Sequence, residues 1–280
     1  MQASATDNRP RPTPLALLSS GRSGSTFLMR LLAGHPEIVA HTLYPCELML
    51  MTFAAFPADK TYGNTNRLFR YAFDGDVEVL KGPLAAKVAF GATEVRGVYD
   101  RMAKNLGKQP RYYLEKTTNS HDLTPMVASF PDIRFVLLLR DPRDTFLSAK
   151  AFNARRGFTA FWEKPGDSDE QSIVRQRARL EGIVSAAEKA PYHVIRYEDL
   201  IEAPQQTLPP LIEWLGLPSS SAIASSMIAS AAAFNERYHK TSASSAASIG
   251  RWQREMSLQR RALFQSHMGD LLKRLGYDGA

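Results

Sequence analysis

A short run of glycine, serine, threonine and arginine at residues 19–26, SSGRSGST, is the first stretch whose residue types suit a chemical task. Its two glycines allow a tight backbone turn, and the amphipathic run that follows predicts a helix. Backbone N–H groups at a helix start and nearby hydroxyls donate hydrogen bonds to an anion. Arg22 adds a planar guanidinium that binds phosphate or sulfate oxygens in a fork. The stretch therefore predicts an anion-binding turn.

This turn departs from a nucleotide P-loop, G-x-x-x-x-G-K-[ST], because Ser25 stands where the lysine should be. A kinase or ATPase uses that lysine on the β- and γ-phosphates and a hydroxyl on magnesium. The turn suits one 5′-phosphate with a further group attached better than it suits a triphosphate. An ordinary strand-to-helix turn without a ligand is the alternative.

A second basic residue follows a buried strand in FVLLLRDPRDTFLS, residues 135–148. Arg140 lies at the carboxyl end of that strand and Ser148 lies in the next helix, so the two side chains could hold a second phosphate. Taken alone, Arg140 and Asp141 could equally form a surface ion pair or a helix cap. Together with the first turn they predict two anion sites.

The elements that would position these residues alternate between strand and helix. Short apolar runs predict strands at 15–18, 111–118, 134–139 and 192–197. A helix follows the first turn and ends at Gly34 and Pro36. The helix after Arg140 has an Asp141 N-cap, Pro142 in its first turn and Gly157 as its stop. This order predicts a three-layer α/β fold with a parallel sheet and ligands at the carboxyl ends of the strands.

The remaining segments predict a single domain over residues 14–280, after a polar, proline-rich and disordered lead-in at 1–13. A helix is expected within 203–218, where Pro209 and Pro210 must kink it or mark its true start. Residues 219–250 are rich in serine and alanine; their first half favours a helix and their second half a flexible loop.

Five blocks, in order, resemble the sulfotransferases that use 3′-phosphoadenosine 5′-phosphosulfate (PAPS). They are GRSGSTFL, EKT (115–117), FVLLLRDPRDTFLS, VIRYEDLIEAPQQTLPPLIEWLGL and SIGRW (248–252). The resemblance implies a P-loop-like fold, PAPS as co-substrate, 3′,5′-ADP (PAP) as product, and transfer of a sulfuryl group to a hydroxyl. It assigns the 5′-phosphosulfate to Arg22, Ser23, Gly24, Ser25 and Thr26, the 3′-phosphate to Arg140, Ser148, Gly250, Arg251 and Trp252, and the adenine to Tyr197. Trp252 could instead be a core aromatic.

In-line sulfuryl transfer requires a base for the acceptor hydroxyl and cations for the charge on the transferred and leaving oxygens. Arg22 is the expected cation, and Lys116 its partner unless it is a surface lysine paired with Glu115. Family members use a histidine or a glutamate as base. Glu47 is the first candidate and His121 the second; His41 lies near Glu47 in sequence. Cys46 is expected to be a small buried thiol.

The composition restricts the class of protein. The chain has 280 residues, a net charge of +7 and one cysteine, so an internal disulfide is impossible and the cytoplasm is the expected location. No apolar run is long enough for a membrane span. No cluster has metal-ligand spacing, and the basic clusters lack the aromatic interleaving of a nucleic-acid platform. A homo-oligomer is left open.

Residues 48–110 and 219–250 are the expected acceptor-site and lid segments. The first is dense in methionine and phenylalanine, which suits an apolar, lipid or carbohydrate-bearing hydroxyl acceptor; the alternative is that these residues simply form core. Two other functions compete: a small-molecule kinase that uses ATP and magnesium, and a non-catalytic binding protein for nucleotides. An exposed, unpartnered Glu47 and Lys116 would favour the binding protein.

Overall fold

The computed structural model describes residues 11–42, 46–56, 91–117, 122–232 and 241–277. Within them, five parallel strands form one sheet in the order β2-β3-β1-β4-β5. The strands are β1 (Thr13–Ser19), β2 (Ile38–Ala40), β3 (Tyr112–Thr117), β4 (Arg134–Leu139) and β5 (Tyr192–Arg196). The sequence-based prediction of a parallel α/β sheet is confirmed, and β2 is the strand it did not include.

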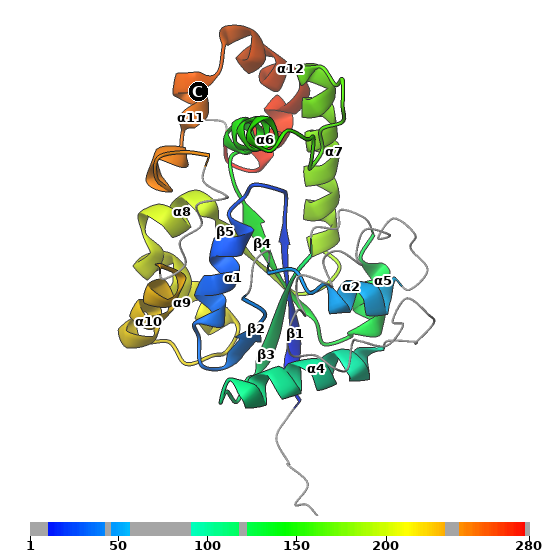
Figure 1. Cartoon of the computed structure of the whole chain (residues 1–280), viewed down its shortest axis with the longest axis vertical. Coiled ribbons are helices and arrows are strands. Elements are labelled where there is room, and N and C mark those ends of the chain that lie inside the picture. Colours follow the sequence, from blue (N-terminus) through cyan, green and yellow to red (C-terminus); the bar gives the residue numbers. More distant parts are fainter. Residues whose placement is uncertain (1–10, 43–45, 57–90, 118–121, 233–240, 278–280) are drawn as a thin grey trace, which may run out of the picture.

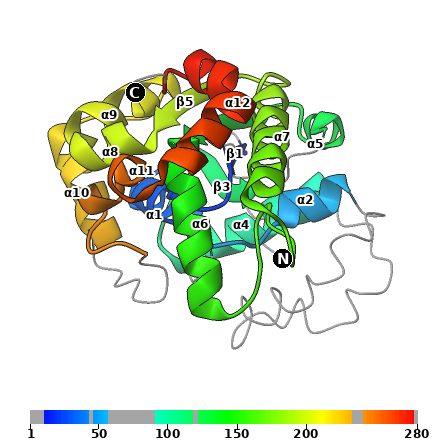
Figure 2. The same cartoon turned by 90° about the horizontal axis from the view of Figure 1, so that it is seen from above.

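Helices cover both faces of the sheet (Figures 1 and 2). Helices α1, α8, α9 and α10 pack on one face, and α2, α4, α5, α7 and α12 on the other. Their bounds are α1 Ser25–Ala33, α2 Leu50–Ala55, α4 Ala92–Asn105, α5 Thr124–Ser129, α6 Pro142–Arg156, α7 Asp169–Ala187, α8 Tyr197–Glu202, α9 Pro204–Trp214, α10 Ser221–Ala232, α11 Arg251–Glu255 and α12 Leu258–Arg274. A 3₁₀ turn, η3, spans Ala246–Ser248.

Alternation along the strands divides the core into two clusters. Leu15 and Leu17 of β1 face the side of α1, whereas Ala16 and Leu18 face the side of α7, and all four are buried. A strand buried on both faces reads as an unbroken apolar run, because neither set of alternating side chains meets water. This is why LALL and RFVLLL were recognisable as strands from composition alone.

The caps expected for the helix after Arg140 are present in α6. The Asp141 side chain accepts a hydrogen bond from the Arg143 amide at 2.8 Å, Pro142 begins the helix, and Gly157 ends it at φ 71°. Figure 1 shows α6 and α11 lying beyond the ends of the strands toward which the arrows point. The residues that could bind a ligand or take part in a reaction lie along that edge of the sheet.

Helix α9 corrects one expectation, because it starts at Pro204 and continues through Pro209 and Pro210. The two prolines therefore do not mark its start. Each proline lacks the N–H that would reach the carbonyl four residues earlier, on Gln205 and Gln206. Both glutamines belong to the exposed side of the helix, where water can hydrogen-bond those carbonyls.

Candidate functional site

The carboxyl ends of four neighbouring strands place the predicted site residues along one edge. The predicted anion-binding turn at residues 19–26, here called the phosphate loop, follows β1. Lys116 lies at the end of β3, Arg140 follows β4, and Tyr197 follows β5. The parallel register pairs Leu17 with Lys116 and Ser19 with Leu138, so these strand ends lie level with one another. Residues far apart in the chain thus meet where ligands bind open α/β sheets.

The phosphate loop is a strained turn that opens directly into α1. Gly24 is the N-cap at φ 89°, and Arg22 has φ 66°, a region that side-chain-bearing residues seldom adopt. Ser23 is fully buried, and its hydroxyl donates to the Ser20 carbonyl at 2.6 Å, which closes the turn. Gly24 has no side chain to cap the first N–H groups of α1, so those donors suit an anion.

Gly24 is also a point of close approach. A Cβ at this position would lie 2.4 Å from Cδ2 of the buried Tyr197 ring. We expect Gly24→Ala to lower the free energy of unfolding by about 1–3 kcal/mol from backbone strain, with a further loss from the ring clash. Urea unfolding measures both.

Gly166→Ala is the matched control for that prediction. Gly166 has φ 83°, but a Cβ there would meet nothing within 4 Å. The Gly166→Ala variant should therefore lose only the part of the free energy of unfolding that comes from backbone strain. An equal loss in the two variants would contradict the close contact between Gly24 and Tyr197.

Arg22 projects from the loop toward α6. Its Nε donates to Ser148 Oγ at 3.2 Å, and its guanidinium lies 4.7 Å from the centre of the Phe152 ring. Ser148 Oγ is also 2.9 Å from Thr241 Oγ1. The sequence-based hypothesis assigned Arg22 and Ser148 to different phosphates; the structure brings them into direct contact. Thr241 had no sequence signal.

Arg140 bridges two loops. Its Nη1 donates to the Arg22 carbonyl at 2.9 Å and its Nη2 to the Ser248 carbonyl at 2.7 Å. The guanidinium also lies 4.4 Å from the centre of the Tyr197 ring, and the Tyr197 hydroxyl is 3.0 Å from Ser248 Oγ. Its Nε is buried and finds no hydrogen-bond partner within the described residues.

The turn at Gly250–Trp252 lies against the first turn of α6. Asp144 accepts hydrogen bonds from both the Gly250 and the Trp252 amides, at 2.6 and 2.9 Å. Trp252 is buried in the core cluster with the Arg143 guanidinium 3.6 Å from its ring centre. Arg251 is paired with Glu255, and its Nη1 is a second buried guanidinium nitrogen without a partner in the part of the chain described.

Glu47 and Lys116 form an ion pair beside the phosphate loop. Glu47 Oε1 is 2.6 Å from Lys116 Nζ, which also lies 3.4 Å from Thr26 Oγ1. The side chains are 21% and 5% exposed, respectively. Lys116 is therefore not a surface lysine paired with Glu115: neighbouring strand residues point to opposite faces, and Lys116 faces α1.

Glu115 anchors the segment that carries Glu47. It accepts hydrogen bonds from the Leu50 and Met51 amides at 3.0 and 2.9 Å and from the Tyr99 hydroxyl at 2.8 Å. Burial raises the pKa of Glu115 to about 7, against the opposing effect of these bonds. The carboxylate holds the start of α2 close to the carboxyl end of β3, and hence Glu47 within reach of Lys116.

The other base candidates are placed differently. His121 lies outside the described residues. Burial lowers the pKa of His41, and its Nε2 is buried without a partner in the described chain. Cys46 is buried, as expected for a small thiol, and its Sγ donates to the Thr42 carbonyl.

Two exposed phenylalanines beside the loop had no sequence signal. The Phe161 ring covers Gly21 so closely that a Cβ there would lie 2.2 Å from it. Phe161 has φ 68° and is 37% exposed, and Phe158 is 53% exposed. Both rings contact Phe152, on which Arg22 stacks. An apolar surface thus borders the loop.

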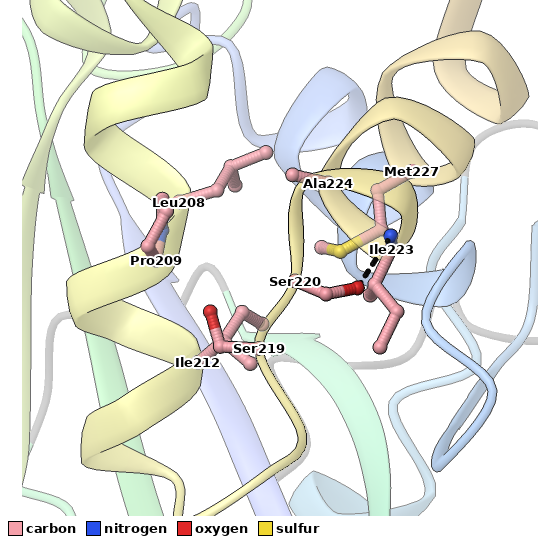
Figure 3. A pocket seen from close by; sticks show the side chains of 8 residues that line it. All are labelled: Leu208, Pro209, Ile212, Ser219, Ser220, Ile223, Ala224 and Met227. Atoms are coloured by element: carbon pink, nitrogen blue, oxygen red, sulfur yellow. Dashed lines mark hydrogen bonds between the residues drawn. The ribbon is translucent and has the colours of Figure 1, made fainter.

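A crevice between α9 and α10 lies away from this edge (Figure 3). Apolar side chains such as Leu208, Ile212 and Met227 line most of it, and Ser220 Oγ accepts a bond from the Ile223 amide. Its volume, about 10 Å³, is that of one water molecule at most. It is too small for a substrate.

The described residues were considered as possible metal ligands and as possible membrane-spanning helices. They contain no cluster of three or more histidine, cysteine, aspartate or glutamate side chains placed to hold a metal ion. Among the helices described, none combines the length and the apolar character needed to cross a bilayer.

Comparison with known proteins decides the family. Residues 14–221 match the profile of the sulfotransferase family, which is well over half of the chain. The chain belongs to the sulfotransferase family. No curated protein matches the sequence of this sulfotransferase. The match favours sulfotransfer over the small-molecule kinase that the sequence left open, in agreement with the missing P-loop lysine. The Gly250–Trp252 turn lies beyond the matched residues.

Solved sulfotransferases share the fold. The sulfotransferase domain of the Synechococcus PCC 7002 olefin synthase is 19% identical, with all of both chains covered and a TM-score of 0.60. A sulfotransferase from Alicyclobacillus acidocaldarius is 17% identical over 97% of this chain and 98% of its own, with a TM-score of 0.51. A mouse sulfotransferase complexed with PAP is 13% identical over 94% and 86%, with a TM-score of 0.50. At these sequence identities the comparison shows that the fold is shared, and nothing beyond the fold.

Proposed function

We propose that this sulfotransferase uses PAPS to transfer a sulfuryl group to an acceptor hydroxyl and releases 3′,5′-ADP. The observation that carries the proposal is the position of Arg140. One guanidinium contacts the Arg22 carbonyl of the phosphate loop, the Ser248 carbonyl and the Tyr197 ring. The two predicted anion sites and the predicted adenine residue therefore meet at one side chain, as a nucleotide phosphorylated at both ends requires.

Unsatisfied donors support the 3′-phosphate part of the proposal. Arg140 Nε and Arg251 Nη1 are buried guanidinium nitrogens to which no described residue offers an acceptor. A buried donor without an acceptor costs about 1–3 kcal/mol. A phosphate has enough oxygens to satisfy both and would offset this cost. PAP, the nucleotide in the mouse structure, carries such a phosphate, and the shared fold agrees with that assignment.

The chemistry we propose assigns one role to each residue. Glu47 accepts the proton of the acceptor hydroxyl as the new oxygen–sulfur bond forms and the bond from sulfur to the 5′-phosphate oxygen breaks. Lys116 and Arg22 stabilise the charge on the sulfuryl and leaving oxygens. Lys116 lies between Glu47 and Thr26, so it links the base to the phosphate loop. No metal is assigned a role.

The ion pair also argues against a non-catalytic binding protein. That alternative predicted an exposed, unpartnered Glu47 and Lys116, yet the two side chains pair at 2.6 Å and are largely shielded. A pure binding site has no use for a carboxylate that would repel an anionic ligand. Proton transfer from the acceptor hydroxyl would give this carboxylate a role.

The acceptor we propose is a small apolar or amphipathic molecule with a hydroxyl, including lipids and carbohydrate conjugates. Exposed Phe158 and Phe161 beside the phosphate loop support an apolar body. Of the expected acceptor segments, 57–90 and 233–240 lie outside the described residues. A cytoplasmic location and a homo-oligomer stay predictions, testable by cell fractionation and light scattering.

A thermal-shift comparison tests the choice of nucleotide. At a free concentration 100 times its Kd, 3′,5′-ADP should stabilise the protein by about 2.7 kcal/mol, since a ligand that binds only the folded state contributes RT ln(1 + [L]/Kd). ATP with magnesium at the same concentration should give a much smaller shift. A larger shift with ATP and magnesium would contradict the proposal, because it would mean that the turn holds a triphosphate.

A further inference from the structure

Asp144, in the first turn of α6, is a buried carboxylate that the proposed chemistry does not use. It is 1% exposed, and its two oxygens accept hydrogen bonds from different backbone amides: Oδ2 from Gly250 at 2.6 Å and Oδ1 from Trp252 at 2.9 Å. A carboxylate accepts bonds but donates none when ionised. Asp144 therefore binds the chain, not an anionic ligand.

The two bonded amides flank Arg251. Gly250 has φ 64°, so the backbone turns sharply just before the arginine, and Trp252 is held in the core beneath the Arg143 guanidinium. With the backbone held on both sides, the path of the Arg251 side chain is restricted. Glu255 then binds its Nε and Nη2 at 2.9 and 2.7 Å, which leaves Nη1 as the buried, unsatisfied donor in the described structure.

The same segment is tied to the sheet at a second point. Arg140, at the end of β4, donates to the Ser248 carbonyl, two positions before Gly250. Asp144 and Arg140 therefore hold one short stretch of chain from the beginning of α6 and from the end of β4. Burial raises the pKa of Asp144, while the two amide bonds and Arg140 oppose that effect, as expected for a carboxylate bound by backbone donors.

We propose that Asp144 is a positioning residue that holds the Gly250–Trp252 turn so that Arg251 faces the 3′-phosphate of the nucleotide. This inference rests on the proposed function. It assigns Asp144 no contact with the substrate. Its effect passes through Arg251, so it should be confined to ligands that carry a 3′-phosphate.

Asp144→Asn tests the inference, because the amide keeps the shape but places an NH₂ group against one of the backbone donors. We expect its Kd for 3′,5′-ADP, measured by calorimetry, to rise about tenfold, while the Kd for 5′-AMP stays within about twofold. Asp270→Asn is the matched control with the same charge change, since Asp270 is 70% exposed and pairs with Arg177. It should change neither Kd.

A double-mutant cycle separates positioning from general damage. Arg251→Ala should reproduce the loss, and combining it with Asp144→Asn should add little, because both variants remove the same interaction. Additive losses would overturn the inference. If wild-type protein binds 3′,5′-ADP no better than 5′-AMP, the proposed function fails; if it does bind it better and Asp144→Asn matches wild type, only the role of Asp144 fails.

Amide hydrogen exchange in the wild-type protein tests the inference even if the Asp144→Asn variant does not fold. In wild-type protein without ligand, the Gly250 and Trp252 amides should exchange much more slowly than free peptide amides, because Asp144 binds both. If both exchange at the free-peptide rate, the turn is not held and the inference is wrong, whatever Asp144→Asn does to folding.

Discussion

Glu47→Gln should reduce turnover by about 10²–10⁴-fold, the range that a positioned general base contributes. Glutamine still accepts a hydrogen bond from Lys116, whose Nζ lies 2.6 Å from Glu47 Oε1, so the local packing should survive. It cannot take the proton of the acceptor hydroxyl. The Kd for 3′,5′-ADP should therefore stay near its wild-type value, while single-turnover kinetics show a slow chemical step.

Glu37→Gln is the control for that experiment. Glu37 is 26% exposed, close to the 21% of Glu47, and lies 3.7 Å from Arg111 in its own ion pair, just before β2 and far from the phosphate loop. Its replacement should leave turnover unchanged. If Glu47→Gln also keeps wild-type turnover, the base lies elsewhere, with His121 the next candidate.

Arg140→Ala should weaken binding of 3′,5′-ADP by about 10²-fold or more, because hydrogen bonds to charged groups contribute about 1.5–3 kcal/mol each. The loss for 5′-AMP should be far smaller. Some loss is expected even there, since Arg140 also holds the Arg22 carbonyl of the phosphate loop at 2.9 Å. Calorimetry with the two nucleotides measures both effects, and equal losses would refute the assignment of Arg140 to the 3′-phosphate.

Arg134→Ala is the matched control for Arg140→Ala. Arg134 begins the strand that Arg140 follows, donates to the Trp214 carbonyl at 2.9 Å and lies 5.3 Å from the centre of the Trp214 ring. It thus loses the same kinds of contact at the opposite end of β4. Its nucleotide affinities should match wild type even if its stability falls.

Local sequence signals predicted the elements that surround the site. The strands β1 and β4 could be predicted from the sequence because strands covered on both faces are apolar throughout. The start and end of α6 were legible because Asp141, Pro142 and Gly157 act through bonds and backbone angles within a few residues. The tight turn that opens into α1 could be predicted for the same reason, because its glycines and hydroxyl residues all lie within residues 21–26. The resemblance to the sulfotransferases is confirmed by the family match over residues 14–221.

Local sequence signals could not predict which side chains contact one another along the edge of the sheet. Asp144 is 106 residues from Gly250, and Arg22 is 126 residues from Ser148, and nothing in either local pattern points to the other. The strand order β2-β3-β1-β4-β5 brings these segments together, and that order depends on how whole helices pack against both faces. Capping and strand periodicity act over a few neighbouring residues, whereas partners between separate elements follow from the packing of the entire core.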